Sequence, residues 1–276
     1  MRGLTVIGGG HVGSVLGRLF SAAGAFTVQD VLSRSADSAA RAAAFIGSGR
    51  AVASYAGLRP ADVFMLSVTD DQIAPACEAL AVAVPLQEAV VFHCSGALAS
   101  DRLHAARAAG AYVASVHPIR SFADADAVAV GFAGTFCGVE GDQQALDVLL
   151  PALTAIGARA VQIDPAAKTV YHAAAVFASN YLVTVIDAAL RAYQAAGIPE
   201  SVARELARPL ALESMENAFR LGAAPALTGP VARGDMATVL RQQDAVMAWD
   251  AETGQLYRAL VPATSALAER KRAGKP

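Results

Sequence analysis

The chain has 276 residues, 55% of them apolar, and a formal net charge of −2. This length allows one large domain or two ordinary ones, and a near-neutral charge without basic runs argues against a nucleic-acid partner. Because Cys77, Cys94 and Cys137 are far apart and odd in number, we expect no disulfide framework, no metal site and a reducing, cytoplasmic location. A strand is predicted almost from the first residue, so we expect no signal peptide.

The first predicted elements are a strand, a glycine-rich turn and a helix. An apolar run over residues 4–7 predicts the strand, and Gly8, Gly10 and Gly13 follow in the spacing G-x-G-x-x-G. In this context the glycines allow a tight turn, a close approach of pyrophosphate and close helix packing. We therefore predict dinucleotide binding by Gly8, Gly9, Gly10, His11, Val12 and Gly13, with the pyrophosphate at the helix N-terminus. The alternative is a glycine-rich turn that binds no nucleotide.

The second predicted strand, residues 26–32, ends where the choice between NAD and NADP is made. NAD sites carry an acidic residue here for the ribose 2′-hydroxyl, but Asp30 falls inside the strand and Ser33, Arg34 and Ser35 follow it. A guanidinium matches a phosphate through two parallel hydrogen bonds. We therefore expect NADP; the alternative is an ordinary polar turn with an exposed arginine.

Six further strands are predicted, and three successive ones end in polar residues. The strands span residues 52–55, 61–68, 89–94, 112–116, 136–139 and 160–163, with helices over residues 38–46, 72–82 and 142–156. Their largely apolar sequences indicate a mostly parallel, doubly wound sheet, which binds ligands at the carboxyl ends of its strands. Ser67, Val68 and Thr69 are therefore candidate cofactor contacts, and Ser95, Gly96 and His117 candidate active-site residues. Each could instead be a cap or turn residue.

Asp164-Pro165 ends the alternation of strands and helices. We predict an NADP-binding domain over residues 1–164 and an all-helical domain over residues 165–276. The predicted helices of the second domain span residues 166–196, 200–221, 235–245 and 248–271.

The first helix of this second domain is apolar but carries a few polar residues. His172 and Ser179 lie within about 20° on a helical wheel, Lys168 lies one turn earlier, and Asn180 is displaced by about 80°. These residues argue against a membrane span over residues 171–190, and we expect a buried helix of a soluble protein. The polar row either faces a cleft between the domains or forms a hydrogen-bonded set in the core.

Four motifs carry a resemblance to a known family: residues 93–98 (HCSGAL), 115–118 (SVHP), 171–180 (YHAAAVFASN) and 228–235 (TGPVARGD). Together they resemble the Rossmann-like proteins with a C-terminal domain of unknown function, DUF2520. The N-terminal part resembles the NADP-binding domains of pyrroline-5-carboxylate reductases, prephenate dehydrogenases and 6-phosphogluconate dehydrogenases. The resemblance covers nearly the whole chain and implies an NADP-dependent oxidoreductase with an all-helical dimerisation domain.

The chain departs from these relatives at two points. The Gly-Pro-Ala run of pyrroline-5-carboxylate reductases is replaced by residues 179–181 (SNY), and the Lys and Asn that hydroxyacid dehydrogenases carry four residues apart are here Lys168 and His172. His117-Pro118 is similar to a substrate-side His-Pro of prephenate dehydrogenases.

The leading hypothesis is an NADP-dependent oxidoreductase for a small carboxylate-bearing keto, hydroxy or imine substrate, like pyrroline-5-carboxylate or ketopantoate reductases. Such chemistry needs a hydride donor, a proton donor and polarising hydrogen bonds. Candidate catalytic residues are His172, Lys168, Ser95 and His117, with His172 favoured as acid/base. Candidate substrate-binding residues are Ser95, Gly96, Arg120, Ser179, Asn180 and Arg233, the arginines as carboxylate partners.

The alternative function is that of a non-catalytic, NADPH-binding regulatory protein. In either case the first helix of the second domain is apolar on all sides, which predicts a homodimer through the helical domain. The resemblance implies the same assembly, with residues 228–235 reaching the site of the partner. We expect no membrane partner.

Overall fold

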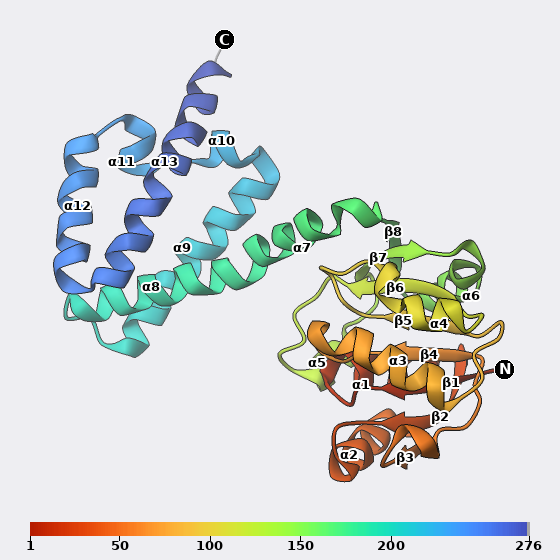
Figure 1. Ribbon diagram of the computed structural model, residues 1–276. Helices are drawn as coiled ribbons and strands as arrows, with labels where there is room; N and C mark the ends of the chain where they lie inside the picture. The colour runs from red at the N-terminus through yellow and green to blue at the C-terminus, as the bar shows by residue number, and fades with distance from the viewer. Residues whose placement is uncertain (275–276) are drawn as a thin grey trace. The chain divides into compact units, whose positions relative to one another are not determined.

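The computed structural model describes residues 1–274, and the chain divides into two compact units (Figure 1). The first unit is Met1–Phe177 and the second begins at Ala178. This division falls later than the boundary predicted after residue 164. The reason is that helix α7 (Lys168–Val176) is bonded to the sheet of the first unit through Lys168 and Tyr171.

The first unit is built on one eight-stranded sheet in the order β3-β2-β1-β4-β5-β6-β7-β8 (Figure 1). Its strands are β1 (Arg2–Ile7), β2 (Phe26–Leu32), β3 (Arg50–Val52), β4 (Val63–Leu66), β5 (Val90–His93), β6 (Tyr112–Pro118), β7 (Phe136–Gly141) and β8 (Arg159–Gln162). Neighbouring strands are parallel except β6 and β7. The strand order reverses between β1 and β4, where doubly wound sheets bind ligands. The predicted α/β fold is confirmed.

Helices cover both faces of the sheet because successive strand residues belong to two different cores. Along β4, Val63 and Met65 belong to one hydrophobic cluster, Phe64 and Leu66 belong to the other, and all four are fully buried. The α-helices of this unit are α1 (His11–Ala22), α2 (Ala36–Ile46), α3 (Ile73–Ala83), α4 (His104–Ala108), α5 (Ala125–Val130), α6 (Gln143–Ala155) and α7. Because both faces of the sheet are packed, a ligand site is expected at the ends of its strands.

The strand predicted over residues 52–55 is misplaced, because β3 occupies residues 50–52. The cause is the buried carboxylate of Asp30, which accepts hydrogen bonds from Arg50 Nε at 3.0 Å and from Arg59 at 2.8 Å. Burial opposes ionisation of Asp30, but the bonds from Arg59 and Arg50 outweigh it and lower the pKa of this carboxyl. Asp30 is thus a structural ion-pair residue inside the sheet and is not available to a ribose.

The second unit is all-helical, as predicted. Its helices are α8 (Leu182–Ala195), α9 (Glu200–Leu221), α10 (Ala223–Ala226), α11 (Gly229–Arg233), α12 (Met236–Trp249) and α13 (Ala251–Ala273). The helix predicted over residues 235–245 extends to Trp249. Asp250 then begins the next helix, because its carboxylate accepts a hydrogen bond from Thr253 N at 2.7 Å. Arg191 of α8 joins this corner through Thr253 Oγ1 at 2.9 Å.

A π-helical turn, Phe177–Tyr181, joins α7 to α8. A π turn contains more residues than an α turn, so the helical-wheel angles predicted for Ser179 and Asn180 relative to His172 are wrong. The run Pro165–Ala195 has the length and composition of a membrane span, with a mean hydropathy of 1.6, although polar residues interrupt it. The predicted burial of this helix is wrong for the single chain, since every residue of α8 is at least partly exposed.

Candidate functional site

The glycine-rich turn after β1 requires glycine by its geometry. Gly8 has a φ of 111°, in the region that disfavours residues with a side chain. Its carbonyl accepts a hydrogen bond from Ser67 Oγ at 2.8 Å, and a side chain at Gly13 would collide with the same hydroxyl. The turn is therefore held tightly against the loop that follows β4.

The N-terminus of α1 is open to an anion. Gly10 is its N-cap, and no side chain caps the helix. A methyl group built on Gly10 would meet nothing within 4 Å, so the space in front of the helix is free. Since the first N–H groups of a helix are unpaired and carry a partial positive charge, a pyrophosphate fits this position. Next to it, His11 Nδ1 donates to the Phe122 carbonyl at 2.5 Å.

Arg34 lies at the end of β2, as predicted, and is exposed. Its guanidinium makes no hydrogen bond or ion pair with any residue in the described range 1–274. The hydroxyls of Ser33 and Ser35 hold the turn in place. Ser33 Oγ donates to Ser38 Oγ at 3.0 Å and accepts from Gly9 N at 3.3 Å. Ser35 Oγ caps α2 by accepting from Ser38 N at 3.2 Å. The turn therefore presents a free cation beside the glycine loop.

Arg41 is a second cation near this place that the sequence did not suggest. It lies on α2 and, with Gly9, His11 and Ser14, lines a cavity of about 500 Å³. No motif marks it, because only the packing of α2 beside α1 brings it to the glycine loop.

The loop after β4 lies at the carboxyl end of this strand, and its side chains and backbone make local contacts. Ser67 is used to bind the Gly8 carbonyl, Val68 packs against the second hydrophobic cluster, and Thr69 accepts a hydrogen bond from Gln72 N at 2.8 Å. Of these three residues, Ser67 contacts the glycine turn. Their contact with a nucleotide stays a prediction.

The loop after β5 is closed by His93 and Ser95. His93 is fully buried; its Nδ1 accepts from Ser95 N at 3.1 Å and its Nε2 donates to the Ala99 carbonyl at 3.0 Å. Burial, with the nearby charge of Lys168, lowers the pKa of His93 to about 4, although the bond to the Ala99 carbonyl opposes this shift. Ser95 Oγ accepts from the backbone N–H groups of Ala97 and Leu98 at 3.1 and 3.0 Å. Both residues thus fix the loop that carries Gly96.

Lys168 is buried beneath the same loop. Its ammonium donates to the Ser95 carbonyl at 3.0 Å and to Ser115 Oγ, and it lies 3.9 Å from Glu140. Glu140 in turn accepts from Ser100 N at 2.8 Å and from Ser100 Oγ at 2.7 Å. Burial lowers the pKa of Lys168, and the Glu140 charge opposes this shift. The arrangement ties α7, β6 and β7 to the loop after β5.

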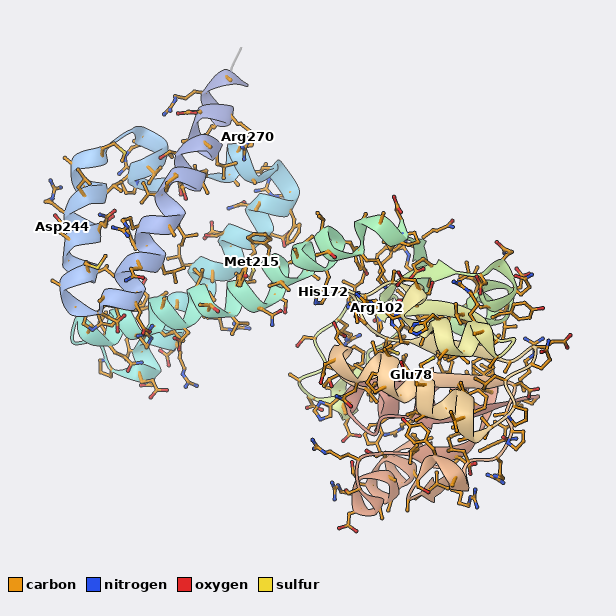
Figure 2. The ribbon with its side chains drawn as sticks, viewed as in Figure 1. Glu78, Arg102, His172, Met215, Asp244 and Arg270 are labelled. Atoms are coloured by element: carbon orange, nitrogen blue, oxygen red, sulfur yellow. The ribbon has the colours of Figure 1, made fainter. Side chains whose placement is uncertain are left out.

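Two imidazoles meet at Gly96. A side chain at Gly96 would collide with His172 Nδ1 and would lie 2.8 Å from His117 Nε2. The two rings are 5.4 Å apart between centroids at 77°, and His172 Nδ1 is buried without a hydrogen-bond partner in the part of the chain described. His172 is on α7 (Figure 2) and His117 on β6. The predicted group of Ser95, His117 and His172 is therefore assembled within the first unit.

The remaining predicted substrate residues have different surroundings. Arg120 Nη1 donates to the Gly131 carbonyl and to Thr135 Oγ1 at 3.2 Å, which holds the side chain in place and leaves Nη2 and Nε without a partner among residues 1–274. Ser179 and Asn180 are exposed residues of the second unit. Arg233 also lies there, beside Lys271 in a cavity of about 340 Å³.

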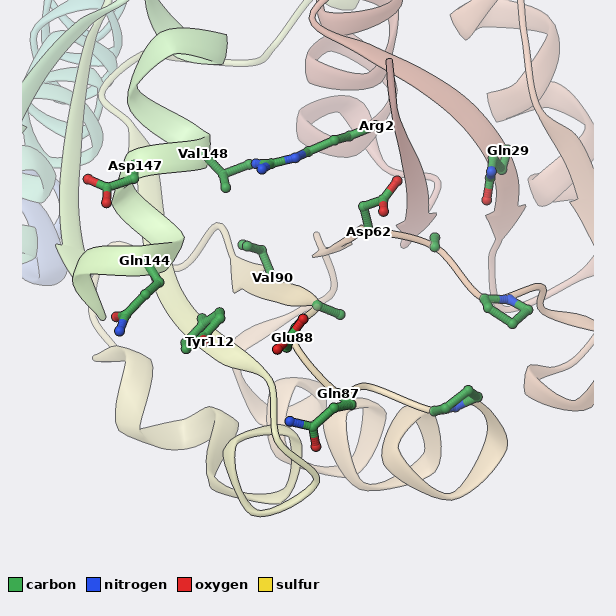
Figure 3. Close-up of a pocket in the computed structure, with 14 residues that line it drawn as sticks. Arg2, Gln29, Asp62, Gln87, Glu88, Val90, Tyr112, Gln144, Asp147 and Val148 are labelled. Carbon is green, nitrogen blue, oxygen red and sulfur yellow. The ribbon is translucent and has the colours of Figure 1, made fainter.

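A larger cavity of about 830 Å³ lies at the opposite edge of the sheet (Figure 3). Arg2, Asp62, Val90 and Tyr112 line it, and they mark the amino ends of β1, β4, β5 and β6. None of the predicted site residues contributes to it. The size of a cavity thus does not identify the nucleotide edge of this sheet.

The sheet and the glycine turn define a Rossmann-type α/β fold, which is followed by a helical C-terminal region. Residues 135–264 match the domain of unknown function DUF2520. This part of the chain therefore carries the DUF2520 domain that the motifs at residues 171–180 and 228–235 indicated.

Solved structures with the same fold cover nearly the whole chain. Protein BF3122 from Bacteroides fragilis, named for a suspected NADP oxidoreductase activity, shares 20% identity and a TM-score of 0.81 over 96% of this chain and 98% of its own. Protein TM1727 from Thermotoga maritima shares 29% identity, with a TM-score of 0.73 over 98% and 99%. An imine reductase from Myxococcus stipitatus in complex with NADP⁺ shares 18% identity, with a TM-score of 0.66 over 98% and 94%. No curated protein matches the sequence.

Sequence reasoning missed four residues of this site: Ser115, Glu140, Gly138 and Tyr171. Only Glu140 had a usable signal, since a single carboxylate inside an otherwise apolar strand needs a buried partner. The other three depend on the antiparallel pairing of β6 with β7, which places Glu140 opposite Ser115 and Gly138 opposite His117.

Proposed function

We propose that this protein is an NADP-dependent oxidoreductase that transfers a hydride between NADPH and a small keto, hydroxy or imine substrate bearing a carboxylate. The observation that carries the proposal is that three features share the carboxyl side of one sheet. The free N-terminus of α1 follows β1, the unpaired Arg34 follows β2, and Gly96, against which His117 and His172 pack, follows β5. The fold is that of NADP-dependent reductases such as the imine reductase. A cytoplasmic location belongs to the proposal, and all three cysteines are free thiols.

The residues present fit the cofactor. The backbone at the start of α1 holds the pyrophosphate in front of Gly10, and Arg34 binds the 2′-phosphate because it has no competing partner. NADPH supplies the hydride when it is bound. The protein contributes the position of the substrate and the path of the proton.

His172 exchanges the proton in this proposal. Its Nδ1 is buried against Gly96, so Nε2 is the nitrogen left to meet a substrate. Lys168 has its ammonium enclosed by Ser95, Ser115 and Glu140, and it acts by holding the loop of Ser95 and Gly96. Arg120 is the candidate for the substrate carboxylate in the first unit, because only its Nη1 is bonded, and Arg233 is the candidate in the helical unit.

The experiment is a screen of small keto acids and cyclic imines for NADPH consumption, followed by nicotinamide absorbance. With a substrate in hand, His172→Asn should lower kcat by about 10²- to 10⁴-fold while NADPH binding is retained. His104→Asn, a change at an exposed histidine of α4, is the matched control. Unchanged turnover in His172→Asn would remove His172 from the mechanism, and tight NADPH binding without turnover of any substrate would favour the regulatory alternative.

We also propose a homodimer through the helical unit. Val202, Leu206 and Leu210 lie four residues apart on α9 and are 41%, 46% and 59% exposed. Such spacing forms one continuous apolar stripe, and no residue of the neighbouring α8 is buried. Sedimentation should give a dimer at micromolar concentration. A double change of Leu206 and Leu210 to Glu should give monomers, whereas Arg208→Glu on another face of α9 should not; a monomeric unmodified protein would refute the proposal.

A further inference from the structure

Tyr171 reaches from α7 to the ring of His117 on β6. The phenol oxygen lies 2.8 Å from His117 Nδ1 and the two rings are perpendicular, with centroids 5.5 Å apart and an interplanar angle of 89°. Gly138, which is opposite His117 in the β6–β7 pair, makes this contact possible. A side chain at Gly138 would collide with the Tyr171 hydroxyl, so the phenol occupies the space above a glycine.

The direction of this hydrogen bond follows from what each group offers. His117 Nδ1 is the phenol's one hydrogen-bond partner among residues 1–274. A phenol donates well and accepts poorly, because its lone pairs are shared with the ring, while a neutral imidazole nitrogen is a strong acceptor. Burial raises the pKa of Tyr171 to about 12, so the hydroxyl keeps its proton at neutral pH. The hydroxyl therefore donates to Nδ1, which must carry the lone pair.

The protonation state of His117 is set by its surroundings. Burial, with the nearby His172 and Lys168, lowers the pKa of His117 to about 4. The imidazole is then neutral near pH 7 and has a single N–H group. Since Nδ1 accepts from Tyr171, this proton belongs to Nε2.

His117 Nε2 lies against Gly96 and is free to donate. It makes no hydrogen bond within the described part of the chain. Unlike the neighbouring His172 Nδ1, it is not a buried atom without a partner. An N–H group at the ligand edge of the sheet, next to a second imidazole, can donate to a substrate oxygen or nitrogen.

We propose that Tyr171 is a positioning residue that fixes His117 in the neutral form with its proton on Nε2, so that His117 is a hydrogen-bond donor to the substrate. His117 thereby polarises the carbonyl or imine, and the proton itself comes through His172. The tautomer rests on the Tyr171–His117 geometry and on the neutral state of the imidazole, whereas the role toward substrate rests on the proposed oxidoreductase function. The two imidazoles at Gly96 thus have different tasks although they touch the same residue.

The test is the ¹⁵N NMR spectrum of the five histidines in the full-length protein at pH 7, without cofactor or substrate. The signals of His117 are assigned by their loss in His117→Asn. We expect a protonated Nε2 and an unprotonated Nδ1 in the unmodified protein. Tyr171→Phe should convert these signals toward a mixture of both tautomers, while Tyr112→Phe at the other end of β6 should leave them unchanged.

A second variant protects the test against a folding failure. Gly138→Ala displaces the phenol without removing it and should produce the same mixture. A proton on Nδ1 in the unmodified protein, or wild-type signals in whichever of the two variants folds, would overturn the proposal. When a substrate is known, Tyr171→Phe should also lower kcat/KM by about three- to tenfold, as expected for one neutral hydrogen bond. Absence of any turnover would defeat the proposed function but leave the tautomer result intact.

Discussion

Acid should destabilise the first unit through His93. The buried imidazole of His93 is satisfied only in its neutral form, because Nδ1 accepts from Ser95 N and Nε2 donates to the Ala99 carbonyl. The unfolded chain protonates His93 below pH about 6.5, whereas in the folded chain burial lowers its pKa to about 4. Between these values the unfolded state binds more protons, so acidification lowers the free energy of unfolding.

The size of the effect follows from the two pKa values. The contribution is fully present above pH 6.5 and fully lost below about 4, and its total is about 3 kcal/mol at about 1.4 kcal/mol per pKa unit. Between pH 7 and pH 5 the loss should be about 2 kcal/mol. Other groups titrate in the same range, but they are common to the unmodified protein and to a variant that lacks only His93.

The assay is denaturant unfolding at pH 7, 6 and 5 of the unmodified protein and of His93→Gln. The variant should be less stable at pH 7, because it loses the bond to Ser95 N, but its stability should fall by about 2 kcal/mol less on acidification to pH 5. His104→Gln, at an exposed histidine, should show the same pH dependence as the unmodified protein. Equal slopes in the unmodified protein and in His93→Gln would refute the reasoning.

Two further predictions concern the cofactor. Arg34→Ala should weaken NADPH binding by about 10- to 100-fold, the value of one charge-assisted contact, and leave NADH binding nearly unchanged. The matched control is Arg102→Ala at an exposed arginine. Equal affinities of the unmodified protein for NADPH and NADH would contradict this prediction. Gly10→Ala should leave the free energy of unfolding within about 0.5 kcal/mol, because its methyl group meets nothing within 4 Å, yet weaken NADPH binding by occupying the space of the pyrophosphate. The NADPH affinity of each variant is measured by fluorescence titration, and the free energy of unfolding by denaturant unfolding. Undiminished NADPH binding in Gly10→Ala would place the pyrophosphate elsewhere.

The elements that the sequence predicted best are those with a strong local pattern. The apolar strand β4 and the glycine turn carry their own signals, since a two-sided core requires Val63–Leu66 and a tight turn requires Gly8. The position of β3 could not be predicted, because it depends on the long-range pairing of Asp30 with Arg50 and Arg59.

The candidate site could be predicted only at the level of which loops approach each other. The parallel strands place Ser95 and His117 at one edge, as expected. The helical-wheel positions predicted beyond Val176 are wrong, because no residue type indicates the π turn Phe177–Tyr181 in the sequence. The burial of Lys168 and the phenol bond of Tyr171 arise from one antiparallel strand pair, which the sequence pattern does not distinguish from a parallel one.

The position of the unit boundary after Phe177 has an evolutionary consequence. His117, Tyr171 and His172 are all encoded before this boundary, so the groups proposed to handle the proton are inherited together with the nucleotide-binding sheet. Replacement or divergence of the helical unit, which contains Arg233, would then leave the proton chemistry in place. Descendants of one ancestral sheet could in this way acquire new substrates by changing the second unit alone.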